Sequence, residues 1–314
     1  MNSSLIDNHG RKIRKLRISL LDACNFRCFY CMPIDAKFMQ PAKWLTGEQI
    51  ETICRVLTNH GIEQVRVTGG EPTLRRDFRD IMTRLTKLPI KKVGLTTNGM
   101  LLSKHLDFLK ATNCMHINIS LDSLREERFN TITRTQSFDN VYKSIIQARE
   151  MEFNLKLNVV LMKGINDDEI IDFVKFSETS GIEVRFLEVM RIGQACNPQN
   201  DMFISANDCI KIIKNHYELN PVQMEMDATS FNFLTPKGAQ IGFIASESQP
   251  FCGSCSRWRL SADGFLRACL MSQNGINIRD ISIDEYPSFF SKLLAMKPTG
   301  RIKEIEQDMN QIGG

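Results

Sequence analysis

The sequence predicts an α/β protein in which a parallel sheet or barrel is followed by a smaller domain. Between residue 17 and about residue 190, apolar or β-branched runs alternate with amphipathic helical patterns, giving six βα units. After residue 190 the alternation ends, and hairpin and turn signals take its place. A chain of 314 residues is long enough for one large domain or two ordinary ones. We therefore expect a βα-repeat domain over residues 1–195 and a smaller domain over residues 196–314.

The predicted strands of the first domain are short apolar segments bounded by turn residues. They cover residues 17–21, 64–68, 92–97, 116–121, 156–161 and 184–189. The first predicted helix begins at Thr46, because Gln49 three residues later completes a capping box. The apolar positions of this helix follow helical spacing, so Cys54 is expected in the core. Further helices are predicted over residues 76–87, 103–110, 140–151 and 168–180.

The second domain is predicted to mix a few helices with short strands. Ser205 is expected to cap a helix that runs to about residue 216. A hairpin should turn at Pro236-Lys237-Gly238, and another strand pair should turn around residues 262–264. A last helix near residues 286–294 precedes a polar tail that ends in Gly313-Gly314.

The composition excludes several classes of protein. Lysine and arginine total 40 against 36 acidic residues, a net charge of only +4, which argues against a surface that coats nucleic acid. A hydrophobic fraction of 42% with 24% charged residues is typical of a folded globular chain. No apolar stretch approaches the roughly 18 residues that a membrane span needs, and the N-terminus lacks the apolar run of an export signal. We expect a cytoplasmic protein whose basic cluster at residues 11–15 is mainly a solvated face.

Six of the ten cysteines fall into two triplets. The first triplet is Cys24, Cys28 and Cys31, and the second is Cys252, Cys255 and Cys269. We do not expect disulfides between these cysteines, because the thiols of a cytosolic protein are kept reduced and a triplet leaves one thiol over. Clustered thiolates instead indicate ligation of a soft metal.

The first triplet lies directly after the first predicted strand. Three thiolates within eight residues can ligate three irons of a [4Fe–4S] cube and leave the fourth iron open to a substrate. The alternative is a structural zinc site, which usually has four protein ligands. Simple packing does not explain all three cysteines, since the loop also contains Asn25 and Arg27.

The second triplet, taken alone, fits an iron–sulfur cluster and an incomplete zinc ribbon equally well. Its neighbours favour the cluster, because Arg257 and Arg259 project to one face of a strand and two guanidinium groups suit a phosphate. A single arginine would more often form a surface salt bridge.

These motifs resemble those of the radical S-adenosylmethionine superfamily. Cys24, Cys28 and Cys31, with the aromatic Tyr30, match its C-x3-C-x-φ-C motif, and Gly69-Gly70-Glu71-Pro72 resembles its segment for the methionine amino group. The resemblance implies a partial (βα)6 TIM-type barrel, one [4Fe–4S] cluster and bound S-adenosylmethionine.

The second triplet, the Arg-x-Arg pair and the terminal Gly-Gly are together similar to the GTP 3′,8-cyclase family of molybdenum cofactor biosynthesis. This similarity implies a smaller C-terminal α+β domain that carries an auxiliary [4Fe–4S] cluster. It also implies a lyase in which the reduced first cluster cleaves S-adenosylmethionine. The resulting 5′-deoxyadenosyl radical takes hydrogen from ribose C3′, and C3′ then attacks guanine C8 to give 3′,8-cyclo-7,8-dihydro-GTP. The implied partners are a reductase or other electron donor and a MoaC-type cyclic pyranopterin monophosphate synthase downstream, with the chain as a monomer or homodimer.

The resemblance also implies roles for individual residues, each matched to a motif position of this sequence. The first cluster would be held by Cys24, Cys28 and Cys31, and the auxiliary cluster, whose open iron meets guanine, by Cys252, Cys255 and Cys269. S-adenosylmethionine would contact Tyr30, Gly70, Ser120, Arg185 and Met190. GTP would contact Arg17, Arg66, Thr96, Lys156, Arg257, Trp258 and Arg259. Catalysis would be assisted by Arg17, Arg257, Arg259, Gly313 and Gly314. One departure is Gln64, where some relatives carry a basic residue, and it is expected to weaken binding of the triphosphate.

Two other functions compete with this interpretation. A radical S-adenosylmethionine enzyme acting on a peptide would share both triplets, but it gives no reason for the Arg-x-Arg pair or the terminal glycines. A zinc-stabilised module that binds RNA would need a broad basic surface, which the net charge does not suggest. The terminal glycines also have a plain explanation as a loose chain end.

Overall fold

The computed structural model describes residues 4–313, whose strands form one twelve-stranded sheet with the order β12-β11-β10-β1-β2-β3-β4-β5-β6-β9-β8-β7. The first six strands are β1 (Lys15–Ser19), β2 (Gln64–Thr68), β3 (Lys92–Thr97), β4 (His116–Ser120), β5 (Asn154–Leu161) and β6 (Glu183–Glu188). The later strands are β7 (Asn220–Val222), β8 (Phe231–Leu234), β9 (Gln240–Ile244), β10 (Arg257–Leu260), β11 (Phe265–Arg267) and β12 (Ile276–Asn277).

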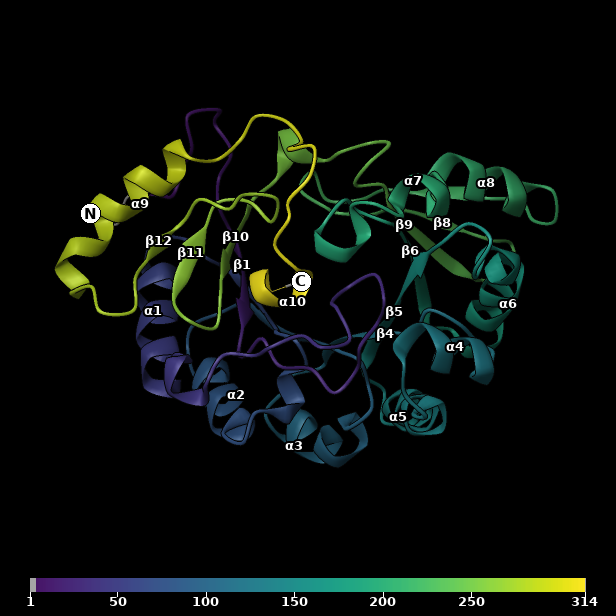
Figure 1. The fold of residues 1–314 in the computed structure, drawn as a ribbon, viewed down its shortest axis with the longest axis horizontal. Coiled ribbons are helices and arrows are strands. Elements are labelled where there is room, and N and C mark those ends of the chain that lie inside the picture. The colour runs from purple at the N-terminus through teal and green to yellow at the C-terminus, as the bar shows by residue number, and fades with distance from the viewer. Residues whose placement is uncertain (1–3, 314) are drawn as a thin grey trace.

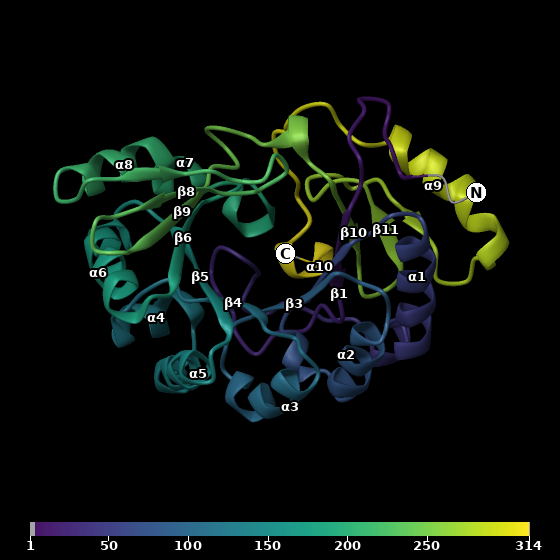
Figure 2. The ribbon, with the colours of Figure 1, turned by 180° about the vertical axis from the view of Figure 1, so that it is seen from behind.

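The middle of the sheet, from β10 through β1–β6 to β9, is parallel, and the strands beyond it are antiparallel. Figure 1 shows that these strands curve into an incomplete ring with the helices on its outside, and Figure 2 shows the same ring from behind. The fold is therefore the expected α/β partial barrel, since the connections of the parallel strands run over the outer face.

Most of the helices cover the outer face of the sheet and bury their apolar sides against it. Those of the barrel are α1 (Gly47–Asn59), α2 (Phe78–Thr86), α3 (Leu106–Ala111), α4 (Glu126–Thr133), α5 (Phe138–Glu150) and α6 (Ile170–Ser180). The remaining helices are α7 (Gln199–Met202), α8 (Ala206–Lys214), α9 (Tyr286–Ala295) and α10 (Met309–Ile312). The main core lies between sheet and helices, and it includes Cys54 as predicted.

Most predicted elements are confirmed, and the differences have local causes. The strands β2 and β3 have the predicted bounds, and α1 begins with the capping box of Thr46 and Gln49. The strand β1 begins at Lys15 rather than Arg17, because Lys15 and Leu16 already pair with both β2 and β10. The helix α4 was not predicted, since it is only eight residues long and buries just three of them.

The C-terminal part of the chain extends both edges of the six-stranded core of the barrel. The predicted hairpin forms β8 and β9, and β9 pairs in parallel with β6. The second predicted strand pair forms β10 and β11, and β10 pairs in parallel with β1. Residues on either side of the proposed boundary at residue 195 thus share one sheet, and the division into two domains stays a prediction.

The last described residues lie inside the ring. The short helix α10 and the C-terminal segment occupy the middle of the ring in both views (Figure 1, Figure 2). Asn310 anchors this segment, because its side-chain amide donates a hydrogen bond to the Asp22 carbonyl at 3.0 Å. None of the helices in residues 4–313 is long and apolar enough to cross a membrane.

Candidate active site

The inside of the ring contains a cavity of about 660 Å³ that parallel strands from β10 to β6 line together. The cysteine loop after β1, the Gly69-Gly70 turn after β2 and Met190 after β6 all reach it. These segments follow the C-terminal ends of their strands, which is where barrels of this kind carry their active sites.

Positive charge is concentrated in this cavity although the whole chain is nearly neutral. Eight cationic side chains line it against three carboxylates. The cations are Lys15, Arg17, Arg66, Lys92, Lys156, Arg185, Arg257 and Arg259, and the carboxylates are Asp122, Glu188 and Glu225. Because buried charges of one sign repel one another without a counter-ion, the cavity fits an anionic ligand.

Strand register brings three of the arginines into one row. Arg17 on β1 pairs with Arg259 on β10 and with Arg66 on β2. Burial, and then the neighbouring Arg259, Arg66 and Arg257, lower the pKa of Arg17 well below its ordinary value. Burial and Arg185 lower the pKa of Arg66 to about 10, and burial and Arg257 lower the pKa of Arg259 to about 10. All three pKa values fall mainly because the guanidinium groups are buried, and the neighbouring cations lower them further.

The row has room for Arg66 because its neighbour is a glycine. A Cβ on Gly94 of β3 would lie 2.9 Å from Cζ of Arg66, so a larger residue would displace the guanidinium. Arg66 Nη1 donates hydrogen bonds to the Leu95 carbonyl at 3.0 Å and to Asn118 Oδ1 at 3.2 Å. These contacts fix the Arg66 side chain within the cavity wall.

A second row of side chains lies two residues earlier on the same strands. Lys15 on β1 pairs with Gln64 on β2, which pairs with Lys92 on β3. Lys15 is partly neutralised, because its Nζ lies 2.8 Å from Asp227 Oδ1 and 3.6 Å from Glu225 Oε2. The uncharged Gln64 therefore sits between two lysines.

Several buried polar atoms of the cavity wall have no hydrogen-bond partner among the described residues. They are Thr96 Oγ1, Asn158 Oδ1 and Arg257 Nη2. Buried polar groups are rarely left unpaired, so these atoms indicate where a polar ligand fits.

Lys156 and Arg185 share one carboxylate. Glu183 on β6 accepts from Lys156 Nζ at 2.6 Å and from Arg185 Nε at 2.5 Å. Burial would raise the pKa of Glu183, but Arg185 and Lys156 lower it. Part of the charge of these two cations is thereby neutralised within the protein.

The cysteine loop brings its three thiols together at one end of the cavity. Cys24, Cys28 and Cys31 all line the cavity. Burial together with Glu71 raises the pKa of Cys24 to about 12, and burial together with Cys24 raises that of Cys31 to about 12. The pKa of Cys28 is raised mainly by burial and also by Asp122 and the other two thiols. Three mutually close thiols fit the ligand set of an iron–sulfur cluster, whose positive irons would displace their protons.

The two glycines of Gly69-Gly70 are required by the packing of the cysteine loop itself. A Cβ on Gly70 would lie 2.2 Å from the Ala23 carbonyl oxygen, and one on Gly69 would lie 2.7 Å from that of Leu21. Glu71 then bonds the neighbouring loop, accepting from Thr97 Oγ1 and from the Asn98 amide, both at 2.7 Å. The three loops after β1, β2 and β3 are thus joined into one surface.

Tyr30 is held by a buried carboxylate. Its hydroxyl donates to Asp122 Oδ2 at 2.6 Å, and the Val160 amide donates to Asp122 Oδ1 at 2.8 Å. Burial raises the pKa of Asp122 to about 6, although the bonds from Tyr30 and Val160 oppose this shift.

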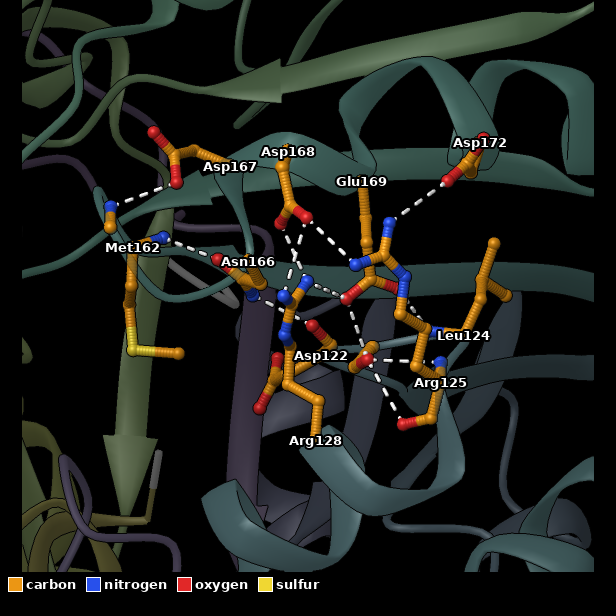
Figure 3. Close-up of polar contacts among 12 residues, drawn as sticks. Asp122, Leu124, Arg125, Arg128, Met162, Asn166, Asp167, Asp168, Glu169 and Asp172 are labelled. Atoms are coloured by element: carbon orange, nitrogen blue, oxygen red, sulfur yellow. Dashed lines mark hydrogen bonds and ion pairs between the residues drawn. The ribbon is translucent and has the colours of Figure 1, made fainter.

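A polar network supports the loop that carries Asp122 (Figure 3). Asn166 donates to the Asp122 carbonyl at 2.6 Å, and Glu169 accepts from the Leu124 amide at 2.7 Å. Arg128 bonds both Glu169 and Asp168, at 2.6 Å and 2.5 Å. The loop after β4 is therefore bonded to the segment after β5, and these contacts hold Asp122 where it can accept from Tyr30.

The second cysteine triplet lies beside β10, outside the cavity lining. Cys252 begins a short 3₁₀ turn (Cys252–Ser254), and Cys255 follows this turn and leads toward β10. Burial raises the pKa of Cys252, and the nearby Cys269 and Cys255 raise it further. Burial would raise the pKa of Cys255 too, but Arg257 and Lys297 lower it to about 7.

Among residues 4–313, no three histidine, cysteine or acidic side chains converge as a ready site for one metal ion. A cubane cluster does not require such convergence, because each cysteine ligates its own iron. The spaced but mutually close thiols of both triplets therefore fit a cluster.

The structure brings most of the predicted site residues to one cavity. Its lining includes Arg17, Cys24, Cys28, Tyr30, Cys31, Arg66, Gly70, Thr96, Ser120, Lys156, Arg185, Met190, Arg257 and Arg259. Gly313 lies next to this set, since its carbonyl accepts from Arg259 Nη1 at 2.7 Å. Gly314 lies outside the described residues.

Two expectations were wrong. Trp258 does not reach the cavity: its side chain is fully buried on the other face of β10, with its ring 5.7 Å from that of Phe290. Successive side chains of a strand point to opposite faces, so Trp258 cannot accompany Arg257 and Arg259. The basic cluster at residues 11–15 is not simply a solvated face either, because Arg11 is buried against Asp7 and Lys15 lines the cavity.

The candidate site also involves four residues to which the sequence analysis gave no role there, namely Lys15, Lys92, Asp122 and Glu183. Strand alternation held a signal for Lys92, which shares a face of β3 with the predicted Thr96. The same signal exists for Glu183, which shares a face of β6 with the predicted Arg185, but its contact with Lys156 depends on the register between β5 and β6.

Comparison with known proteins agrees with this geometry. Residues 18–177 match the Radical SAM superfamily, and residues 182–297 match Molybdenum Cofactor Synthesis C. The ring of strands, the cysteine loop and these matches define the class, and the chain belongs to the radical SAM superfamily.

Similar proteins show to which family within the superfamily the chain belongs. The chain is 48% identical to the GTP 3′,8-cyclase of Synechocystis sp. over 314 residues, which is 100% of this chain and 96% of that protein. It is 39% identical to the GTP 3′,8-cyclase of Petrotoga mobilis, over 99% of this chain and 100% of that one. The chain therefore belongs to the family of GTP 3′,8-cyclases, as the sequence motifs predicted.

Solved structures of two other proteins share the fold. Streptococcus suis SuiB bound to S-adenosylmethionine has a TM-score of 0.66 at 15% identity, covering 91% of this chain and 68% of SuiB. The structure of anSMEcpe with bound AdoMet has a TM-score of 0.62 at 16% identity, covering 92% of this chain and 84% of that chain. These structures support the partial barrel as the fold.

Proposed function

We propose that this chain is a GTP 3′,8-cyclase that binds GTP in the barrel cavity and catalyses the first step of molybdenum cofactor biosynthesis. The observation that carries the proposal is the cavity itself, where eight cations and three carboxylates surround a space that the cysteine loop also faces. A nucleoside triphosphate supplies the negative charge that this cavity lacks.

The residues of the first cysteine loop would hold a [4Fe–4S] cluster, and S-adenosylmethionine would lie against Tyr30, Gly70, Ser120, Arg185 and Met190. When bound, this pair supplies the electron and the 5′-deoxyadenosyl radical that removes the C3′ hydrogen of GTP. The chain's own contribution is to fix both molecules and exclude water, which lowers the barrier by positioning. A reductase or other electron donor would supply the electrons, and a MoaC-type synthase would consume the product.

GTP would lie between the two cysteine triplets. Arg17, Arg66, Lys156 and Lys92 are suited to its phosphates, and the unpaired Thr96 hydroxyl offers a further hydrogen bond. Arg257 and Arg259 would contact the nucleotide beside the second triplet, whose auxiliary [4Fe–4S] cluster would leave one iron open toward guanine. Gly313, which bonds Arg259, and Gly314 would assist initiation of the radical reaction.

A peptide substrate is the weaker alternative. Streptococcus suis SuiB, which has been crystallised with its precursor peptide, shares the fold at only 14% identity. The excess of cations in the present cavity has no use in binding a generic peptide, whereas it suits a triphosphate.

The test is an anaerobic assay of the reconstituted holoprotein with dithionite and S-adenosylmethionine, with and without GTP. Chromatography should detect 5′-deoxyadenosine and a cyclised guanine product, both dependent on GTP. The Cys24→Ala variant is the matched control and should form neither product. Release of 5′-deoxyadenosine at a rate indifferent to GTP would contradict the assignment of GTP as substrate.

A further inference from the structure

Lys297 is a buried lysine that neither the family motifs nor the proposed mechanism uses. It follows α9, and only 3% of its surface is exposed. A buried ammonium is costly unless an anion or several acceptors surround it. Its surroundings therefore indicate what it is for.

The ammonium group contacts three segments that all belong to the second cysteine triplet. Lys297 Nζ donates to the Arg257 carbonyl and to the Ala268 carbonyl, both at 2.9 Å. It also lies 3.5 Å from Cys255 Sγ. One side chain thus joins the end of the Cys252–Cys255 turn, the start of β10 and the residue just before Cys269.

A second buried cation fastens the same region from the other side. Arg11 Nη1 donates to the Cys252 carbonyl at 2.6 Å, and Arg11 Nη2 donates to the Lys297 carbonyl at 3.4 Å. Arg11 has a countercharge of its own, because its Nε lies 2.6 Å from Asp7 Oδ2. Arg11 is therefore neutralised within the protein.

Lys297 has no such carboxylate. Its three partners are two neutral carbonyls and a thiol, and none of the acidic side chains in the described part of the chain forms an ion pair with it. Among these partners in the described residues, Cys255 Sγ is the one that can carry a negative charge, and a cluster bound to the triplet would hold that thiolate ionised.

We propose that Lys297 is the positioning residue of the auxiliary cluster, holding the three ligand-bearing segments together and balancing the charge of the ligated thiolates. The inference rests on the proposed function in one respect, the presence of a cluster at the second triplet. It adds a residue outside the cysteine and arginine motifs on which that cluster depends.

The experiment isolates the auxiliary cluster and then changes Lys297. In a background in which Cys24, Cys28 and Cys31 are all alanine, the reconstituted full-length chain should hold about four irons, all at the second triplet. In that background, Lys297→Met removes charge and hydrogen bonds, whereas Lys297→Gln keeps amide donors without the charge. Lys292→Met, which alters an exposed lysine on α9, is the matched control.

Iron and sulfide content, electron paramagnetic resonance of the reduced protein and apoprotein melting are the readouts. We expect both Lys297 variants to retain less than about half of the iron of the background protein, with an unchanged melting temperature in the Gln variant. The Lys292 control should keep its iron. Full iron with an unaltered resonance signal in the Gln variant would overturn the inference and leave the proposed function standing. A background protein that holds no iron at all would instead overturn the auxiliary cluster, and this inference with it.

Discussion

At the scale of single residues, the strand β10 shows how alternation decides which side chains can meet a substrate. Arg257 and Arg259 line the cavity, whereas Trp258 between them is buried in the outer core against Phe290. The sequence predicts that the two arginines share one face of the strand because they are two residues apart, and both do line the cavity. Trp258 was assigned to the site because it lies between the two arginines in the sequence. The two-residue period of a strand instead places its side chain on the opposite face.

The first prediction is that Lys92, which lies beside the uncharged Gln64, contributes to binding of the triphosphate. Lys92 lines the cavity next to Gln64 in the strand register, and burial, Arg66 and Lys156 lower its pKa while Glu225 opposes the shift. We expect Lys92→Gln to raise the Kd for GTP about tenfold, because a charge-assisted bond to phosphate is lost at a cost of about 1.5 kcal/mol. Binding of guanosine, which has no phosphate, should change little in isothermal titration calorimetry.

The neighbouring Lys91 is the control for that prediction. Its side chain is 73% exposed and pairs with Glu63 at 3.3 Å, so Lys91→Gln should leave GTP binding unchanged. Adding Gln64→Lys to the Lys92→Gln variant should restore affinity. Equal weakening of guanosine and GTP would show that Lys92 acts on the fold rather than on the triphosphate.

At the scale of elements, the least predictable features are pairings between distant segments. The six strands of the barrel are predictable because each is a short segment with apolar or β-branched residues that is followed by a helical pattern. The parallel pairing of β10 with β1, and of β9 with β6, joins segments that are far apart in the sequence and leaves no periodic signal. The alignment of Arg17 with Arg259 depends on the pairing of β10 with β1. The cationic residues could therefore be predicted from the sequence, but the row that they form across β10, β1 and β2 could not.

The C-terminal element gives the second prediction. Gly313 has a φ of +74°, and a Cβ there would lie 2.8 Å from Cβ of Ser19. Gly313→Val should displace the segment from Arg259, since a side chain costs about 1–2 kcal/mol in the left-handed region even before the clash. We expect turnover of GTP to fall about tenfold or more while iron content stays unchanged, as measured by chromatography and iron assay.

Gly300 provides a matched position for this substitution. It has no positive φ, and a Cβ there would meet no atom within 4 Å. Gly300→Val should keep normal turnover. If Gly313→Val kept it as well, the C-terminal segment would have no part in the reaction.

At the scale of the whole molecule, charge is distributed in a way that composition conceals. A net charge of +4 describes the chain, yet eight cations gather in one cavity. The expectation that the chain does not coat nucleic acid comes from the average composition, whereas the gathering of these cations in one cavity comes from the fold. The pairing of Lys156 and Arg185 with Glu183 shows that part of this charge is already balanced internally.

The burial of His116 near these cations predicts how the stability of the protein depends on pH. Burial, and then Lys92, Arg66 and Lys156, lower the pKa of His116 from 6.5 to about 4. Between these values the unfolded chain binds a proton that the folded chain does not, so the His116 contribution to the free energy of unfolding increases as pH rises from about 4 to about 6.5. His116→Gln should flatten that part of the profile in urea titrations, and an unchanged slope would contradict the assignment.

The parallel ladder between β1 and β10 has a consequence for how such enzymes can diversify. The strand β1 runs directly into the first cysteine loop, and β10 starts two residues after Cys255, so a few backbone hydrogen bonds set the spacing of the two candidate redox centres. A slip of two residues would change that spacing by about 7 Å. The C-terminal region could therefore be exchanged for one that recognises another substrate only if the new strand paired with β1 in the same alignment.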